Sequence, residues 1–347
     1  MGGVRLQDVA ELAGVSMKTV SNVVRGYKHV STSTRDRVQR AIDELDYRPN
    51  LMGRTLATGR TGLIALSFSN VGIPYFAELS RLVSAAAHSM GYRVLVDETD
   101  GTLEGERAVL ESFEAGLVDG MLFQPAVVSS LEIARHRSAV PIVILGEGAA
   151  PLTMDRVMID NVSAARDATN HLITLGRRRI AFAGHESGKL SAASSQRIMG
   201  YQQALEDAGI APDPQLLLPR DTVTPMAAVL GVGRALDEGT RFDGLVCRDD
   251  LAAIGALRAL QERGIRVPDD VALTGWDNIM MSRVTHPSIT SLAPDTAALT
   301  LRAMEMLVER IEGMEGAGRH ELVGHRLVIR ESAPAVSDRT QESVLQR

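Results

Sequence analysis

Residues 6–25 read LQDVAELAGVSMKTVSNVVR, and this stretch decides how the chain begins to fold. Ala10 is small enough to let a following helix cross closely, and Gly14 is suited to the turn between two helices. Ser16 can start the second helix, because its side chain can accept a hydrogen bond from a backbone amide one turn later. Val20 belongs to an apolar stripe at helical spacing. The stretch therefore predicts a helix-turn-helix.

The second helix of this pair has a polar, hydroxyl-rich and basic outer face. Side chains of these types can reach base edges in a major groove, and they come from Met17, Lys18, Ser21, Asn22 and Arg25. A third helix is expected to end at residue 45, since the residue before Pro49 avoids helical geometry. Three such helices could also form a structural module for protein interaction, but the exposed residues suit DNA better.

The charge distribution agrees with a DNA-binding head. Residues 1–60 hold ten Lys or Arg against six acidic residues, a net charge of +4. The rest of the chain has a net charge of −10, which gives the overall net charge of −6. Only the head is therefore expected to contact phosphate, because basic residues release counterions from DNA and acidic ones are repelled by it.

Several classes of protein are disfavoured by what the chain contains. With 45% hydrophobic and 23% charged residues it is typical of a globular protein, and its single cysteine, Cys247, excludes an internal disulfide. It has neither a signal-peptide pattern nor 18 consecutive apolar residues, so we expect a cytoplasmic protein with no membrane segment. The eight histidines are scattered, and we expect no metal, no cofactor and no catalytic residues.

From residue 63 the pattern changes to alternating strands and helices. Buried parallel strands are expected at 63–68, 93–96, 120–123, 141–145, 179–183, 245–247 and 271–274. Helices are expected at 75–90, 104–115, 161–175, 195–208, 251–263 and 296–311. This alternation predicts a doubly wound α/β body, and its length favours two lobes with a cleft at the carboxyl ends of the strands.

Taken together, the motifs resemble those of the LacI/GalR family of transcriptional regulators, over residues 4–333. The head contributes DVAELAGVS and TVSNVV, and the linker contributes YRPN and RTLATGRT. The body contributes Pro74-Tyr75-Phe76, Ile159-Asp160-Asn161, Arg197 with Gly200-Tyr201, Asp249-Asp250-Leu251-Ala252 and Gly275-Trp276-Asp277-Asn278.

The resemblance implies an α/β protein with an N-terminal three-helix helix-turn-helix domain and a hinge helix. A two-lobed periplasmic-binding-protein-like domain of doubly wound parallel sheets follows. The expected boundaries are 1–48 for the DNA-binding domain, 49–61 for the hinge helix and linker, and 62–334 for effector binding and dimerisation. A disordered tail is expected at 335–347, because this segment is polar.

The resemblance also implies roles in DNA binding. Base edges would be read by Met17, Lys18 and Asn22, while phosphates would be contacted by Ser16, Thr19, Ser21 and His29. Arg25, Asn50 and Arg54 complete the expected DNA-binding set. Leu56 and its dimer mate would insert into the minor groove and kink the operator. A linker helix this short is marginal alone, so DNA and the dimer mate would supply its partners.

In the body, the resemblance implies that seven residues line an effector pocket: Tyr75, Phe76, Asp160, Arg197, Asp250, Trp276 and Asp277. Carboxylates and a guanidinium can bond to neighbouring hydroxyls, and an aromatic ring can cover the apolar face of a sugar. Each residue also has an ordinary structural explanation. Asp160 and Asp250 could cap helices, and the two aromatic residues could belong to the core.

The sequence thus predicts a homodimeric repressor that binds a near-palindromic operator and is controlled by a small polar effector, a sugar or sugar derivative. Two alternatives share the two-lobed body. A solute-binding protein would be expected to carry an export signal and no DNA-binding head. A sugar-processing enzyme would need acid and base groups, whereas sugar-binding aspartates paired with arginine need no perturbed pKa.

Overall fold

The computed structural model describes residues 4–24, 27, 29–47, 59–112, 116–135 and 140–335. The chain divides into two compact units, Met1–Gly62 and Leu63–Arg347. Among the described residues, no helix is both long and apolar enough to cross a membrane. Of the expected DNA-binding residues, Arg25, Asn50, Arg54 and Leu56 lie outside the described part of the chain, as do most of the expected hinge and all of the tail after Ala335.

The first unit is the expected helix-turn-helix head. Its three helices are α1 (Leu6–Ala13), α2 (Met17–Val24) and α3 (Thr32–Glu44). Gly14 ends α1 in the left-handed region, with φ of 61°, a conformation that glycine adopts without steric cost. The three helices bury one shared core, formed by Val9, Ala10, Ala13, Val20, Val23, Val38, Ala41 and Tyr47.

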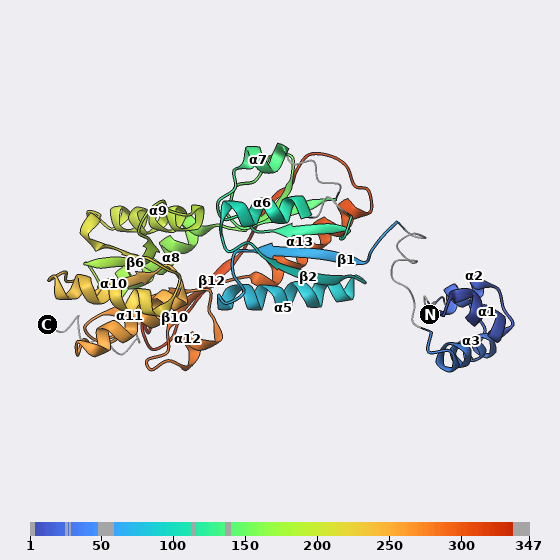
Figure 1. Cartoon of the computed structure of the whole chain (residues 1–347). Helices are drawn as coiled ribbons and strands as arrows, with labels where there is room; N and C mark the ends of the chain where they lie inside the picture. Colours follow the sequence, from blue (N-terminus) through green and yellow to red (C-terminus); the bar gives the residue numbers. More distant parts are fainter. Residues whose placement is uncertain are drawn as a thin grey trace. The chain divides into compact units, whose positions relative to one another are not determined.

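The second unit contains two six-stranded sheets, one in each lobe (Figure 1). In the first lobe the strand order is β11-β5-β4-β3-β1-β2, and every pairing is parallel. These strands are β1 (Leu63–Phe68), β2 (Arg93–Glu98), β3 (Gly120–Phe123), β4 (Ile142–Leu145), β5 (Asp155–Ile159) and β11 (His320–Val323).

In the second lobe the order is β12-β10-β9-β8-β6-β7. These strands are β6 (Ile180–Glu186), β7 (Leu217–Arg220), β8 (Gly244–Cys247), β9 (Ala272–Trp276), β10 (Thr290–Pro294) and β12 (His325–Val328). The pairing of β10 with β12 is antiparallel, whereas parallel sheets were expected. The chain reaches β12 directly from β11 of the other lobe, so this strand enters the sheet from its opposite end.

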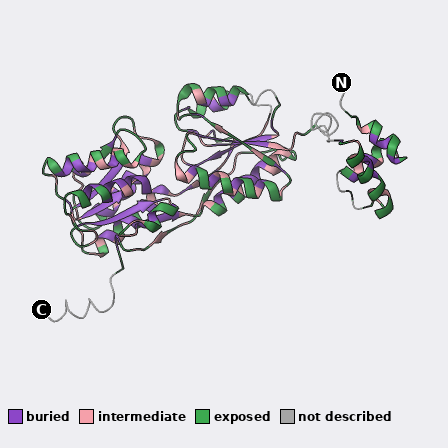
Figure 2. Ribbon diagram, turned by 60° about the horizontal axis from the view of Figure 1, so that its bottom comes forward, coloured by how far each residue is buried: buried purple, intermediate pink, exposed green. Residues whose placement is uncertain are grey.

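Helices cover both faces of each sheet and bury its central strands, whereas β2, β11 and β12 at the sheet edges are partly exposed (Figure 2). In the first lobe, α5 (Pro74–Ser89) and α13 (Thr296–Ile311) pack on one face, and α6 (Leu103–Ser112) and α7 (Ser130–Arg135) pack on the other. In the second lobe, α10 (Pro225–Asp237) and α11 (Asp250–Glu262) lie opposite α8 (Asn161–Thr174) and α9 (Ala192–Asp207). Two short elements, η2 (Pro214–Leu216) and α12 (Met280–Val284), precede β7 and follow β9.

One strand that was expected to be buried, β2, is partly exposed. β2 is parallel as predicted, but it is the edge strand of its sheet and is not buried, and both Leu95 and Val96 are exposed. An apolar run of four residues indicates a strand without showing which side of it is covered. The exposed apolar edge is typical of a surface that meets another chain.

Candidate DNA-reading face and inter-lobe site

The reading face is the outer side of α2. Ser16 accepts a hydrogen bond from the Thr19 amide at 3.2 Å and so caps the helix, as expected. Val20 and Val23 hold the inner side in the core, and the outer residues are left exposed or half-buried. The most exposed are Ser16, Met17 and Lys18, while Thr19, Ser21 and Asn22 are half-buried.

His29 lies after α2 and is also exposed. Its ring meets the edge of the Tyr27 ring, with centroids 5.5 Å apart. Arg35 of α3 donates a hydrogen bond to the Tyr27 carbonyl at 2.9 Å and so connects this segment to the third helix. The head therefore presents an aromatic and imidazole pair beside a basic residue, which suits contact with a DNA backbone.

The expected effector residues lie at the carboxyl ends of the strands, where parallel α/β sheets bind ligands. Arg197 of α9 is buried, and its guanidinium lies 3.9 Å from the centre of the Trp276 ring. It donates through Nε to Asn161 Oδ1 at 2.8 Å and through Nη1 to the carbonyl of Arg248. These contacts fix the direction of the guanidinium before any ligand binds.

Side chains from the two lobes interact at this point. Burial raises the pKa of the Tyr75 hydroxyl well above its usual range, and the negative charges of Glu147 and Asp277 raise it further, while Arg197 opposes them. Tyr75 and Glu147 belong to the first lobe, whereas Asp277 and Arg197 belong to the second. Residues of both lobes thus approach one another where the effector site was expected.

Four buried polar atoms around this site have no hydrogen-bond partner within the described chain: Gln124 Oε1, Glu147 Oε1, Glu186 Oε2 and Trp276 Nε1. Gln124 follows β3, Glu147 follows β4, and Glu186 ends β6. Buried polar groups are normally paired, so an unpaired set is what a site awaiting a hydrogen-bonding ligand would show. Three of the four atoms are acceptors, which favours a ligand rich in hydroxyl or amino donors.

Several of the residues expected to bind the effector make contacts within the protein and are not exposed to a ligand. Phe76 stacks on Phe68 in the first-lobe core, with ring centroids 4.8 Å apart. Asp160 caps α8 by accepting from the Ser163 amide at 3.0 Å. Asp250 is fully buried, and Trp276 is only 1% exposed beneath Arg197. Asp250 was considered as a possible cap of α11, but the cap is the preceding residue, Asp249, which accepts a hydrogen bond from the Ala252 amide at 2.8 Å.

Asp249 is also the centre of a buried charge cluster that the sequence did not reveal. Arg220 makes a two-pronged contact with its carboxylate, and Arg248 donates to it at 2.8 Å. These arginines hold the pKa of Asp249 at about 2 despite its burial. Arg248 also donates through Nε to Ser194 at 2.6 Å. Both arginines are thus occupied by protein groups.

Two aspartates have the opposite shift. Burial raises the pKa of Asp250 to about 7 and that of Asp277 to about 6, and the negative charge of Asp277 adds to the shift of Asp250. Sugar binding does not require such shifts, so they were not expected from the sequence. Asp250 is sealed by protein, whereas Asp277 interacts electrostatically with Arg197.

These shifts predict a pH dependence of stability. Both groups bind protons in the folded protein at pH values where the unfolded chain, with aspartate pKa near 3.9, has lost them. The free energy of unfolding should therefore fall as pH rises from about 4 to about 7 and level off above that. Urea denaturation at pH 5, 6, 7 and 8 measures this slope.

Asp277→Asn should make the slope shallower than in the native protein, because asparagine does not titrate. Asp270→Asn is the control, since Arg266 lowers the pKa of Asp270 to about 2 and its contribution is lost only as pH falls below 4. Equal slopes for Asp277→Asn and the native protein would contradict the assignment.

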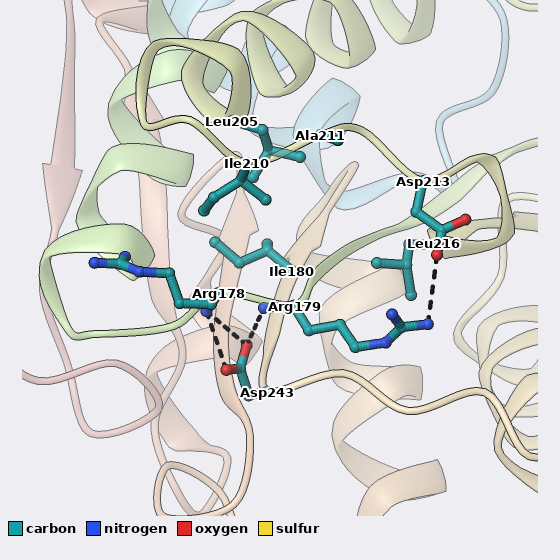
Figure 3. A pocket seen from close by; sticks show the side chains of 9 residues that line it. All are labelled: Arg178, Arg179, Ile180, Leu205, Ile210, Ala211, Asp213, Leu216 and Asp243. Atoms are coloured by element: carbon teal, nitrogen blue, oxygen red, sulfur yellow. Dashed lines mark hydrogen bonds and ion pairs between the residues drawn. The ribbon is translucent and has the colours of Figure 1, made fainter.

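Two surface hollows lie away from this site. One, of about 290 Å³, is bordered by residues before β6 and β8, including Arg178, Arg179 and Asp243 (Figure 3). Asp243 accepts from the backbone amides of Arg178 and Arg179, and Arg179 reaches Asp213 at 3.4 Å. The other, of about 460 Å³, contains the Asp237 and Arg263 pair. Both lie at amino ends of strands, and no group of metal-ligating side chains occurs among the described residues.

Known protein families match both the DNA-binding head and the two-lobed body. Residues 5–50 match the family of bacterial regulatory proteins called lacI, and residues 169–333 match the periplasmic binding protein-like domain. The HTH-type transcriptional repressor CytR of Escherichia coli K12 is 31% identical over 333 residues, which cover 95% of this chain and 96% of CytR.

Two solved structures are similar over nearly the whole chain. The CelR transcriptional regulator in complex with cellobiose is 30% identical, with a TM-score of 0.72 over 95% of this chain and 99% of CelR. The lac repressor dimer bound to operator and the anti-inducer ONPF is 26% identical, with a TM-score of 0.84 over 96% of this chain and 100% of that one. The chain therefore belongs to the LacI family of bacterial transcriptional regulators.

Proposed function

We propose that this protein is a homodimeric repressor that binds a near-palindromic operator and responds to a small polar effector, a sugar or sugar derivative. One observation carries the proposal: the same chain has an exposed polar face on α2 and unpaired polar atoms between the two lobes. A reading helix alone would bind DNA without control, and the lobes alone would only bind a solute.

In this proposal α2 enters the major groove. Met17, Lys18 and Asn22 read base edges, Ser16, Thr19, Ser21 and His29 contact the backbone, and Arg25 faces the major groove. Asn50 and Arg54 add contacts from the linker, and Leu56 inserts into the minor groove. We infer that the protein acts in the cytoplasm.

Exposed apolar side chains support the dimer. On the second lobe these belong to α10 and α12, namely Met226, Leu230, Met280, Met281 and Val284, and on the first lobe to the β2 edge. Arg283 of α12 acts electrostatically on Glu78 of α5, so α12 lies close to the first lobe. A twofold dimer can cover apolar surface from both lobes and place two reading helices on symmetric half-sites.

The effector proposal rests on the free acceptors. Gln124, Glu147 and Glu186 offer unpaired oxygens to a ligand that donates hydrogen bonds, while Tyr75 offers an aromatic ring. CelR was solved with cellobiose, a molecule of this chemical type. We infer the same class for this site.

The two alternatives lead to different results. A solute-binding protein has no use for the α1–α3 head. An enzyme would use Asp277 as an acid or base, because its pKa of about 6 suits proton transfer. We infer no enzymatic activity, since the regulators compared above are not enzymes. Incubation with a bound sugar and detection of more than one product molecule per chain would establish the enzyme instead.

Selection of DNA from a random pool tests the proposal. We expect enrichment of a near-palindrome whose two half-sites are related by a twofold axis. Lys18→Ala should weaken binding to that DNA by roughly 10- to 100-fold and relax the preference at one position of each half-site, because a lysine that reads a base is worth about 1–3 kcal/mol.

Lys189→Ala is the matched control, since Lys189 is an exposed lysine of the body. Its operator affinity should equal that of the native protein in an electrophoretic mobility assay at fixed salt. If the pool yields no enriched sequence, or if Lys18→Ala retains full affinity and preference, the DNA-reading role of α2 is wrong.

A further inference from the structure

The turn that follows β9 has an uncommon backbone. Asp277 has φ of 90° and Asn278 has φ of 53°, so two consecutive residues with side chains lie in the left-handed region. Residues other than glycine rarely adopt this conformation, and it persists only where the surrounding structure enforces it. This turn directs Asp277 toward the inter-lobe site and leads directly into α12.

Hydrogen bonds from one buried carboxylate hold the turn. Asp250, the first residue of α11, accepts from the Ile279 amide through Oδ2 at 2.9 Å. Through Oδ1 it accepts from the Ser291 hydroxyl at 2.7 Å, and that hydroxyl oxygen in turn accepts from the Asn278 amide at 2.9 Å. Both amides that follow Asp277 are thus held by Asp250, one directly and one through Ser291.

The strand beneath is shaped to admit this carboxylate. A Cβ at Gly275 would lie 2.1 Å from Asp250 Oδ1, so only glycine leaves room for the carboxylate beside β9. Asp250 has no exposed surface, and both of its oxygens are engaged. A ligand between the lobes therefore has no free atom of Asp250 to contact.

We propose that Asp250 is a positioning residue for the inter-lobe site: it holds the Asp277–Ile279 turn so that Asp277 faces the ligand, and it fixes the start of α12. Ile279 is the N-cap of α12, and α12 carries the exposed Met280, Met281 and Val284. One buried carboxylate thus connects the ligand-facing Asp277 with an apolar surface. The role of Asp277 rests on the proposed effector site, but the hold on the turn does not.

Residue-resolved amide hydrogen exchange tests this hold without operator or effector. In Asp250→Asn one carboxylate oxygen is replaced by an NH2 group, which donates hydrogen bonds and cannot accept them. At least one of the hydrogen bonds from the Ile279 amide and the Ser291 hydroxyl is therefore lost. We expect the Asn278 and Ile279 amides to exchange roughly tenfold faster or more. Trp276, the only tryptophan in the chain, precedes the turn directly, so its emission maximum should shift.

Ser291→Ala gives a finer test, and it serves if Asp250→Asn fails to fold. The Asn278 amide loses its acceptor in this variant, whereas the Ile279 amide keeps Asp250. Only the first amide should exchange faster. Ser332→Ala is the matched control, because Ser332 is equally buried and bonds to Thr290 and Leu273 instead of the turn.

Ser332→Ala should lower the stability of the protein. The exchange of the Asn278 and Ile279 amides relative to global unfolding should stay as in the native protein, and so should the Trp276 emission maximum. The proposal is overturned if both amides and the emission are unchanged in Asp250→Asn and Ser291→Ala. It is also overturned if Ser332→Ala changes them equally, since that would indicate general loosening. Because no ligand is used, failure here is separate from failure of the proposed repressor function.

Discussion

Arg197→Ala is expected to abolish the effector response while leaving operator affinity unchanged. Arg197 holds three groups of the inter-lobe site at once, namely Asn161, the carbonyl of Arg248 and the Trp276 ring. It also supplies positive charge opposite Asp277. Hydrogen bonds to a charged group contribute about 1.5–3 kcal/mol each, so losing two ligand bonds would weaken binding by about a hundredfold or more.

Trp276 fluorescence measures this loss. The native protein is titrated with sugars, sugar phosphates, polyols and purines, and the compound that gives a saturable change is then used with the variant. Arg177→Ala is the control, because Arg177 is a half-buried arginine of the same lobe that donates to the carbonyls of Pro268, Asp269 and Asp270. A normal response in Arg197→Ala would remove Arg197 from the site.

Operator affinity provides the second readout for this variant. The reading helix belongs to the separate compact unit Met1–Gly62, and its core contains no residue of the body. Arg197→Ala should therefore bind the selected operator as tightly as the native protein. Weaker operator binding in the absence of effector would indicate that the substitution disturbs the body as a whole.

The sequence analysis predicted seven strands by their apolar runs and missed β5, β7, β10, β11 and β12, of which β7 does lie in an apolar run. β5 was missed because it begins Asp155-Arg156, and β10 because Thr290 and Ser291 precede its apolar residues. The buried polar groups in these strands are satisfied by residues far away in the chain, such as Arg319 for Asp155 and Asp250 for Ser291. A local pattern cannot show such pairings, so these strands looked too polar to be buried.

Three helices of the body were missed, the short α7 and α12 and the longer α10, although the signals for α10 were present. Thr224 and Pro225 begin α10 as N-cap and first helical residue, which is the usual arrangement at a helix start. Gly231 and Gly233 then weaken the helical pattern. A Cβ at Gly231 would lie 2.6 Å from the Pro219 carbonyl oxygen of β7, so close packing against the sheet explains why glycine occupies that position.

The inter-lobe site was predicted only in part. Arg197 and Asp277 were identified through family motifs, but Gln124, Glu147 and Arg248 were not. Each of these three lies within two residues of the end of a strand that the sequence did predict, β3, β4 or β8. The rule that ligands bind at the carboxyl ends of parallel strands could therefore have found them. The rule could not have shown which side chains remain unpaired, because that depends on contacts between distant segments.

Asp155→Ala should cause the largest loss of stability in the body. The Asp155 side chain is completely buried at the start of β5, where Arg310 donates two hydrogen bonds to it at 2.9 Å. Arg319 donates through Nη2 at 2.7 Å and through its backbone amide at 2.9 Å. These partners hold the pKa of Asp155 well below its usual range. Removing one partner of a buried ion pair costs about 3–5 kcal/mol, a large fraction of a typical stability of about 5–15 kcal/mol.

Urea denaturation of Asp155→Ala and Glu321→Ala separates a buried pairing from a surface one. Glu321 also binds an arginine through two hydrogen bonds, to Arg302 at 2.8 and 2.9 Å, but both side chains are more than a quarter exposed. An exposed pair contributes about 0–1 kcal/mol, so Glu321→Ala should change the midpoint little. If the two variants lose equal stability, the Asp155 network does not hold the first lobe together. If only Asp155→Ala is strongly destabilised, then α13 and β11, which return from the second lobe, depend on this carboxylate to complete the first.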